Sequence, residues 1–293
     1  MAKPIQRPFD VEKEFRMSMP LSLSVRIVEA PCKTKLHLPF EELVSLAAES
    51  GYSAICMRAS AGGVQTPKKE LRRMKDVDDQ HGLRVSMVTA DFNVPLNNDN
   101  GPDSLRDIGP SLDVAEILGC DLIRICIKKA EDIPFARQSA DRAAERGIRL
   151  AHQCHTTSLF EQVDQILATL AEIDRPDFGI IYEPANLMLC GQNYGPETLA
   201  RLRPHIMNVY VQNHRLNADG EESLPTYCLG DVRFDHLPVW AEGGIDTASM
   251  FAGLGQIGYD RFFTIHQAQG IKTLNDAKVF AKRCAQFVRD REQ

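Results

Sequence analysis

Polar residues that bind metals or move protons recur at the ends of short apolar segments in this sequence. They are Arg58, Asp91, Lys128, His152, Gln153, His155, Glu183, Tyr210, Gln212, His214, His266 and Gln267. Imidazoles and carboxylates transfer protons near neutral pH, and amide oxygens bind hard cations. Burying such groups without partners costs free energy, so their recurrence indicates a polar pocket rather than a purely structural core.

Side-chain alternation sorts these residues further, because every second side chain of a strand points to the same face. Gln153 and His155 therefore share one face, and His152 points the other way. A later segment places three residues on one face: Tyr210, Gln212 and His214.

Four of the strand-end residues can surround one divalent ion with oxygen and nitrogen ligands: Gln153, Glu183, Gln212 and His266. This mixture suits Mn²⁺, Fe²⁺ or a similar ion better than a thiolate site would. Each residue also has a structural interpretation, since Glu183 could cap a helix or pair with an arginine. Arg58 and Lys128 could belong to scaffold salt bridges. The agreement among consecutive strands favours the metal site.

The elements that must position these residues are eight short apolar segments that alternate with helical ones. The predicted strands cover residues 21–28, 52–58, 83–90, 121–127, 148–154, 178–184, 206–213 and 262–267. Eight such units in 293 residues predict a single (β/α)8 TIM barrel, an α/β fold that gathers its strand ends at one pocket. An open doubly wound sheet is the alternative, but no strand-to-helix turn carries a GxGxxG or GxxxxGK[ST] motif.

Helix boundaries and loops fit the same fold. Five glycines at the ends of helical segments, shortly before the next strand, predict left-handed helix ends: Gly51, Gly82, Gly119, Gly147 and Gly258. Helix starts are predicted at Thr66–Pro67 and at Asp246–Thr247. Two long loops, 91–103 and 214–245, follow strands and so lie on the catalytic face, where such loops often form lids.

Composition restricts the class of protein. Lys and Arg total 34 against 40 Asp and Glu, and the net charge of −6 disfavours nucleic-acid binding. No apolar run reaches the length of a membrane span, and the first residues lack the apolar core of a signal peptide, so we expect a cytoplasmic protein. The eight cysteines form no CxxC pair, which favours reduced core thiols. Residues 1–20 are expected to form an arm, one that could order in a homo-oligomer, before a catalytic domain over 21–293.

Five segments carry a resemblance to a known family: LPFEELVSLAAESGYSAICMR, LAHQCHTTSLFEQVDQILATL, FGIIYEPANLMLCGQNYG, MNVYVQN and EGGIDTASMFAGLGQIGYDRFFTIHQ. Together they resemble the xylose isomerase-like TIM-barrel superfamily of sugar isomerases, sugar epimerases and endonuclease IV-type enzymes. The likeness runs from about residue 20 to the end of the chain.

The resemblance implies a divalent metal held by Glu, Asp, His or Gln, and Glu after strands five to eight. These positions fall on Gln153, Glu183, Gln212 and His266, so three of the four differ from the usual pattern. The implied metal is Mn²⁺ first, with Fe²⁺, Co²⁺, Mg²⁺ and Zn²⁺ as alternatives. In the isomerases and epimerases the first and last Glu also move protons, which Gln153 cannot do.

The function that this resemblance implies is a metal-dependent isomerase or epimerase that forms an enediolate from a keto-sugar or sugar acid. We expect His155 to be the base, with His214 as second choice. Arg58 and Lys128 could anchor a carboxylate or phosphate, and His152 and Tyr210 are expected to contact the substrate. The alternatives are a lyase or decarboxylase on a 3-keto sugar or sugar acid and a non-catalytic sugar-binding barrel. An endonuclease IV-type activity is disfavoured because its three-zinc cluster needs more ligands.

Overall fold

The computed structural model describes residues 19–90, 99–267 and 270–292. Most of the predicted N-terminal arm, Asp91 and residues 92–98 of the predicted loop lie outside the described residues.

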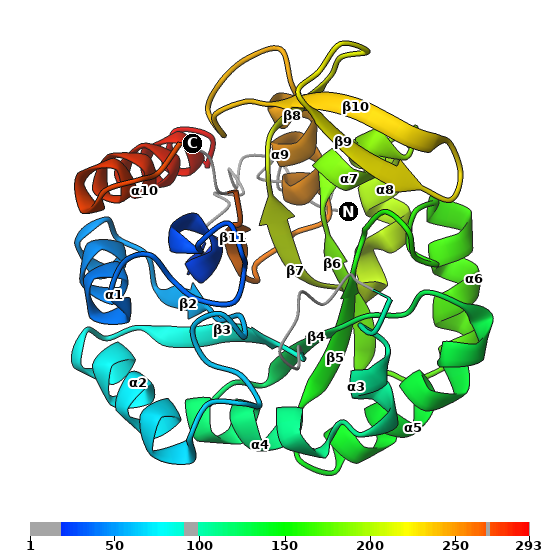
Figure 1. Ribbon diagram of the computed structural model, residues 1–293. Coiled ribbons are helices and arrows are strands. Elements are labelled where there is room, and N and C mark those ends of the chain that lie inside the picture. The colour runs from blue at the N-terminus through cyan, green and yellow to red at the C-terminus, as the bar shows by residue number, and fades with distance from the viewer. Residues whose placement is uncertain (1–18, 91–98, 268–269, 293) are drawn as a thin grey trace, which may run out of the picture.

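Eight parallel strands close into a barrel in the order β1-β11-β7-β6-β5-β4-β3-β2, and helices surround it (Figure 1). The strands are β1 (Leu21–Ser24), β2 (Ala54–Cys56), β3 (Arg84–Thr89), β4 (Leu122–Ile125), β5 (Arg149–Gln153), β6 (Phe178–Tyr182), β7 (Ile206–Val211) and β11 (Phe263–Ile265). Each lies within one predicted segment, and the predicted (β/α)8 barrel is confirmed.

The helices connect successive strands and cover the outside of the barrel. They are α1 (Phe40–Glu49), α2 (Lys68–Gln80), α3 (Asp103–Arg106), α4 (Gly109–Leu118), α5 (Ile133–Ala144), α6 (Val163–Ile173), α7 (Pro184–Leu189), α8 (Pro196–Leu202), α9 (Thr247–Gln256) and α10 (Leu274–Arg289). Both predicted helix starts are confirmed, and all five predicted glycines have a positive φ. No helix among the described residues is long and apolar enough to span a bilayer.

The sequence prediction was wrong in two places. The first strand ends at Ser24, and residues Val25–Val28 form a short 3-10 helix, η1, because Ser24 Oγ accepts a hydrogen bond from the Arg26 amide. Residues 214–245 are not a plain loop. They contain a three-stranded antiparallel sheet of β8 (His214–Leu216), β9 (Glu222–Thr226) and β10 (Gly230–His236), which lies beside the barrel opening in Figure 1.

The inside of the barrel holds an apolar plug with a polar layer above it. The plug consists of Cys56, Met87, Leu122, Ala151, Ile181, Met207 and Tyr210. A residue two positions further along a strand points to the same face of the sheet and lies one layer closer to the carboxyl end of the barrel. Alternation therefore places four polar residues above the plug: Arg124, Gln153, Glu183 and Gln212.

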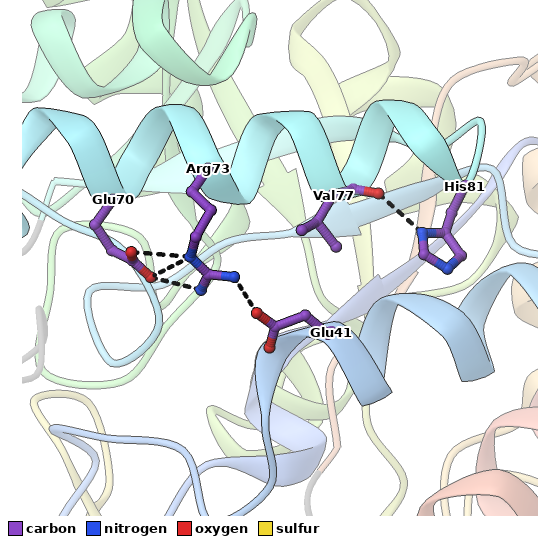
Figure 2. A network of polar contacts seen from close by, with 5 residues as sticks. All are labelled: Glu41, Glu70, Arg73, Val77 and His81. Atoms are coloured by element: carbon purple, nitrogen blue, oxygen red, sulfur yellow. Dashed lines mark hydrogen bonds and ion pairs between the residues drawn. The ribbon is translucent and has the colours of Figure 1, made fainter.

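Helix α2 packs against α1 and α4 and carries both an exposed polar network and a buried acid. Arg73 donates from Nε to Glu70 Oε2 at 2.9 Å and also pairs with Glu41 of α1 (Figure 2). Asp78 is fully buried, and neither of its carboxylate oxygens has a hydrogen-bond partner among the described residues. Burial raises the pKa of Asp78 to about 7, which makes the ionised form costly.

We expect Asp78→Asn to stabilise the protein in a pH-dependent way. The folded-state pKa of Asp78 lies above the unfolded value, so the folded state binds this proton more tightly, and its stability falls as pH rises from about 4 to 7. The amide removes this loss. The gain in the free energy of unfolding should be small at pH 4.5 and on the order of 1–4 kcal/mol at pH 8. Urea unfolding at both pH values measures it, with the exposed Asp76→Asn as control. Equal gains at the two pH values would contradict the assignment.

Candidate active site

A cavity of about 390 Å³ lies over the polar layer at the carboxyl ends of the strands. Its polar walls come from the barrel and include Gln153, His155, Asn186 and Gln212. The β8–β10 sheet supplies the opposite wall, with Leu224, Pro225, Phe234 and His236 among its contributions. A polar floor with a partly apolar wall is typical of small-molecule sites.

Glu183 organises the floor from a fully buried position directly after β6. Its Oε2 accepts hydrogen bonds from Asn186 Nδ2 at 2.9 Å and from Gln153 Nε2, and its Oε1 accepts one from Gln212 Nε2. The three amides line the cavity, and the carboxylate lies behind them. Burial raises the pKa of Glu183 to about 6, although the amide donors and the charges of Arg26 and Arg124 oppose this rise.

The network leaves one buried acceptor beside the cavity without a partner among the described residues. Gln153 is 2% exposed, and its Oε1 has no partner within the described part of the chain. Because Gln153 Nε2 donates to the Glu183 carboxylate, the orientation of the amide is determined. The amide oxygen is therefore held in a fixed, buried position next to the cavity.

Three arginines from different elements line the same cavity. Arg26 comes from η1, Arg124 from β4, and Arg58 follows β2. Arg58 Nε donates to Glu29 Oε1 at 2.9 Å, and both side chains are buried. The pKa of Arg26 is lowered to about 10, by burial first and then by the neighbouring charge of Arg58. The cavity floor therefore has a positive character.

The two predicted catalytic histidines both line this cavity. His155 Nδ1 lies 3.0 Å from the Thr156 carbonyl oxygen, which can only accept, so the proton is on Nδ1 and the lone pair is on Nε2. Burial and the charge of Arg124 hold the pKa of His155 well below its usual value. The His214 ring packs against His236 and Phe234, with centroids 4.5 and 4.6 Å apart, and burial lowers its pKa to about 3.

Three residues expected to contact substrate do not line this cavity. Lys128 Nζ pairs with Asp99 Oδ1 at 3.3 Å. His152 stacks on Phe160 with ring centroids 4.1 Å apart, on the face of β5 away from Gln153. Tyr210 belongs to the apolar plug. Only Arg58 of the four residues predicted to bind substrate reaches the cavity wall.

The predicted metal ligands are brought together only in part. Gln153, Glu183 and Gln212 touch, but the two glutamines direct amide nitrogens toward the carboxylate. His266 Nδ1 is instead 3.0 Å from Ser24 Oγ, and its ring stacks on Tyr210 at 3.9 Å. This set offers one carboxylate, and three arginines line the same cavity. Such a donor set does not fit a divalent cation.

A second cluster of possible metal ligands, outside this cavity, serves to hold two loops together. Within the described ranges, the group of His, Cys, Asp or Glu ligand atoms close enough to share an ion is Glu161, Cys190 and Cys228. However, Glu161 Oε1 accepts from the amides of Thr157 and Tyr227 at 2.5 and 2.7 Å, and Oε2 accepts from the Cys228 amide at 2.9 Å. Glu161 therefore joins the turn between β9 and β10 to the loop after β5.

The sequence analysis missed Arg26, Arg124 and Asn186. A signal existed for Arg124, since a charged residue inside the apolar segment DLIRICI lies on the same face as Leu122. Arg26 offered no such signal. The direction of its side chain depends on η1, and the sequence analysis predicted a strand over these residues. Asn186 reaches Glu183 because both lie on the first turn of α7.

Comparisons with known proteins agree with this architecture. A family model described as xylose isomerase-like TIM barrel matches residues 44–282. No curated protein matches the sequence of this chain.

Solved structures share the fold at low identity. The probable 3-DHS dehydratase of Bacillus anthracis is 16% identical with a TM-score of 0.67, covering 91% of this chain and 98% of that one. D-allulose 3-epimerase of Methylomonas sp. in complex with D-allulose is 17% identical with a TM-score of 0.65, covering 93% and 97%. A xylose isomerase-like TIM barrel protein of Mycobacterium smegmatis in complex with magnesium is 15% identical with a TM-score of 0.66, covering 94% and 98%.

Removing the charge of Glu161 should loosen the sheet wall of the cavity. Glu161→Gln replaces carboxylate acceptors of three backbone amides, and hydrogen bonds to a charged group contribute about 1.5–3 kcal/mol each. We expect amide hydrogen exchange in residues 222–236 to accelerate roughly tenfold or more, with little change in the barrel strands. Mass spectrometry of exchanged peptides measures this, and the exposed Glu197→Gln is the control. Unchanged exchange at residues 222–236 would show that the hydrogen bonds to Glu161 do not stabilise the β8–β10 sheet.

Proposed function

This chain belongs to the xylose isomerase-like TIM barrel family, and we propose that it is an enzyme of the sugar isomerase or epimerase type. Its substrate would be a keto-sugar or sugar acid that enters the cavity above the polar layer. The observation that carries the proposal is His155, a cavity residue whose tautomer is set by the Thr156 carbonyl. The epimerase and dehydratase among the structural neighbours support enzymatic chemistry on small polyols and their acids.

In this proposal His155 Nε2 removes the proton from the carbon beside the substrate carbonyl. A base must be unprotonated to accept a proton, and burial keeps the imidazole neutral at physiological pH. The bond from Nδ1 to the Thr156 carbonyl also stabilises the imidazolium that forms. Return of the proton to the neighbouring carbon gives an isomer, and return to the other face gives an epimer. His214 is the second proton-transfer group proposed.

The amides of the floor orient the substrate. Gln212 and Asn186 line the cavity and bind substrate hydroxyls in this proposal, and Gln153 lies beside them with its Oε1 buried. Glu183 does not reach the cavity and acts as a positioning residue through the amides that it binds. No step is assigned to Mn²⁺ or another expected metal, because the donor set does not fit one.

A lyase is the second candidate. Elimination of water begins with the same proton abstraction, and the protonated base then gives that proton to the leaving hydroxyl, so one residue suffices. A symmetric epimerisation instead needs an acid on the opposite face. Gln153, at the position of one family carboxylate, cannot supply that acid. The dehydratase among the neighbours is consistent with this route.

We expect His155→Gln to abolish deuterium incorporation from D₂O into a substrate. The protein is incubated with a panel of ketoses and sugar acids, and proton NMR follows exchange at each carbon. The loss should be at least 100-fold, since general-base catalysis contributes about 10²–10⁴. His81→Gln is the matched control, because His81 Nδ1 also bonds a backbone carbonyl, that of Val77 at 2.9 Å, on an exposed face of α2 (Figure 2).

The products separate the candidates. Exchange without cleavage supports the isomerase or epimerase, and release of water or CO₂ supports the lyase. Exchange that survives in His155→Gln would remove His155 as the base. No reaction with any member of the panel would favour a barrel that only binds its ligand.

A further inference from the structure

We infer that Arg26, Arg58 and Arg124 form an anion site that takes the place of a catalytic metal, so that the substrate carries a carboxylate or phosphate group. This inference rests on the proposed function for the identity of the reaction, but not for the binding itself. It names the substrate as anionic and the enzyme as independent of divalent metals.

The three guanidinium groups reach one cavity from three separate elements. Arg124 points inward from β4, directly above Leu122 of the plug, and is 3% exposed. Arg58 is 4% exposed and is oriented by its bond to Glu29. Arg26 lies on η1 at the end of β1 and also lines an adjoining cavity of about 700 Å³. Deep burial of this kind is unusual for arginines, which are mostly exposed when they serve only the scaffold.

Charge favours an anion here. Among the described residues that line this cavity, four are cationic, with Lys33 in addition to the three arginines, and Glu222 is the carboxylate. Glu222 is exposed on β9, and Glu183 lies behind the amides. Burial and then the charge of Arg58 lower the pKa of Arg26, and Arg124 adds to this, while the buried carboxylates Glu29 and Glu183 partly offset the repulsion among the three cations. An oxyanion relieves this repulsion, whereas a divalent cation increases it.

Guanidinium groups supply the chemistry that a metal otherwise supplies. They remain charged at all physiological pH values and present planar pairs of N–H donors that match carboxylate and phosphate oxygens. One arginine can hold the anionic group while another donates to the oxygen that becomes negative during proton abstraction by His155. No atom or electron beyond substrate and protein is required.

Anion binding is tested by isothermal titration calorimetry on the full chain after treatment with EDTA. The probes are inorganic phosphate and D-gluconate, with neutral D-fructose for comparison. We expect saturable binding of at least one anion, and at least tenfold weaker binding in Arg26→Gln and Arg124→Gln. Arg175→Gln should bind as the unaltered protein does, because Arg175 precedes β6 at the opposite end of the barrel and pairs with Asp141. Phosphate and gluconate separate the two sources of the oxyanion.

Arg124→Gln changes a buried residue, so thermal unfolding accompanies each titration. Arg26 is only half-buried, so Arg26→Gln carries the test if Arg124→Gln does not fold. Metal independence is measured as Mn²⁺ uptake by electron paramagnetic resonance, where we expect no stoichiometric binding. Uptake of one Mn²⁺ per chain that Glu183→Gln abolishes would overturn the inference, as would equal anion binding in all three variants.

The two proposals fail separately. Anion binding without hydrogen exchange in any sugar would leave the anion site and remove the proposed reaction. Hydrogen exchange in a neutral ketose by a protein that binds neither phosphate nor gluconate would support the proposed reaction and remove the anion site.

Discussion

The buried carboxylate of Glu183 is the interaction on which the site depends. A fully buried carboxylate is costly unless hydrogen bonds compensate it, and three side-chain amides from β5, α7 and the end of β7 do so here. These bonds connect neighbouring parts of the barrel and set the direction of each amide. Because an amide has one donor end and one acceptor end, directing the nitrogen of Gln153 to Glu183 leaves its buried oxygen without a partner among the described residues. The buried carboxylate of Glu183 thereby sets the direction of the amides that form the cavity floor.

The same layer explains why the positive groups matter. In a cavity of low effective dielectric, charges interact more strongly than in water. Arg124 of β4 pairs in register with Ala151 of the neighbouring β5, two residues before Gln153, and both Arg124 and Gln153 line the cavity. A carboxylate at position 153 would be compensated by that arginine or by a cation. Gln153 carries no charge and so does not neutralise the guanidinium of Arg124, which lines the same cavity. The neutral side chain at position 153 and the charge of Arg124 together account for the positive character of the cavity floor.

The extent to which sequence predicts this structure depends on how local the signal is. Continuous apolar segments and glycines before strands are local, and they predicted all eight barrel strands and five left-handed helix ends. Alternation also predicted that Gln153, Glu183 and Gln212 would meet. It failed for His266, because the short β11 ends at Ile265 and the ring turns to Ser24 and Tyr210. The β8–β10 sheet was missed because its strands are polar and half-exposed, without a clear apolar alternation.

The two walls of the cavity differ in composition, because one belongs to the barrel and the other to the β8–β10 sheet. The barrel wall carries the arginines, amides and His155, which are held by strand register and a packed plug. The sheet wall carries Phe234 and His236 beside His214, and it is attached to the barrel loop through Glu161. In the proposed function, the tilted rings of the sheet wall suit a flat or weakly polar face of a ligand, while the floor binds its charged and hydroxyl groups. Under the proposed function, proton transfer belongs to the barrel wall, and substrate shape is selected largely by the β8–β10 sheet, a segment that can change in sequence without disturbing the barrel.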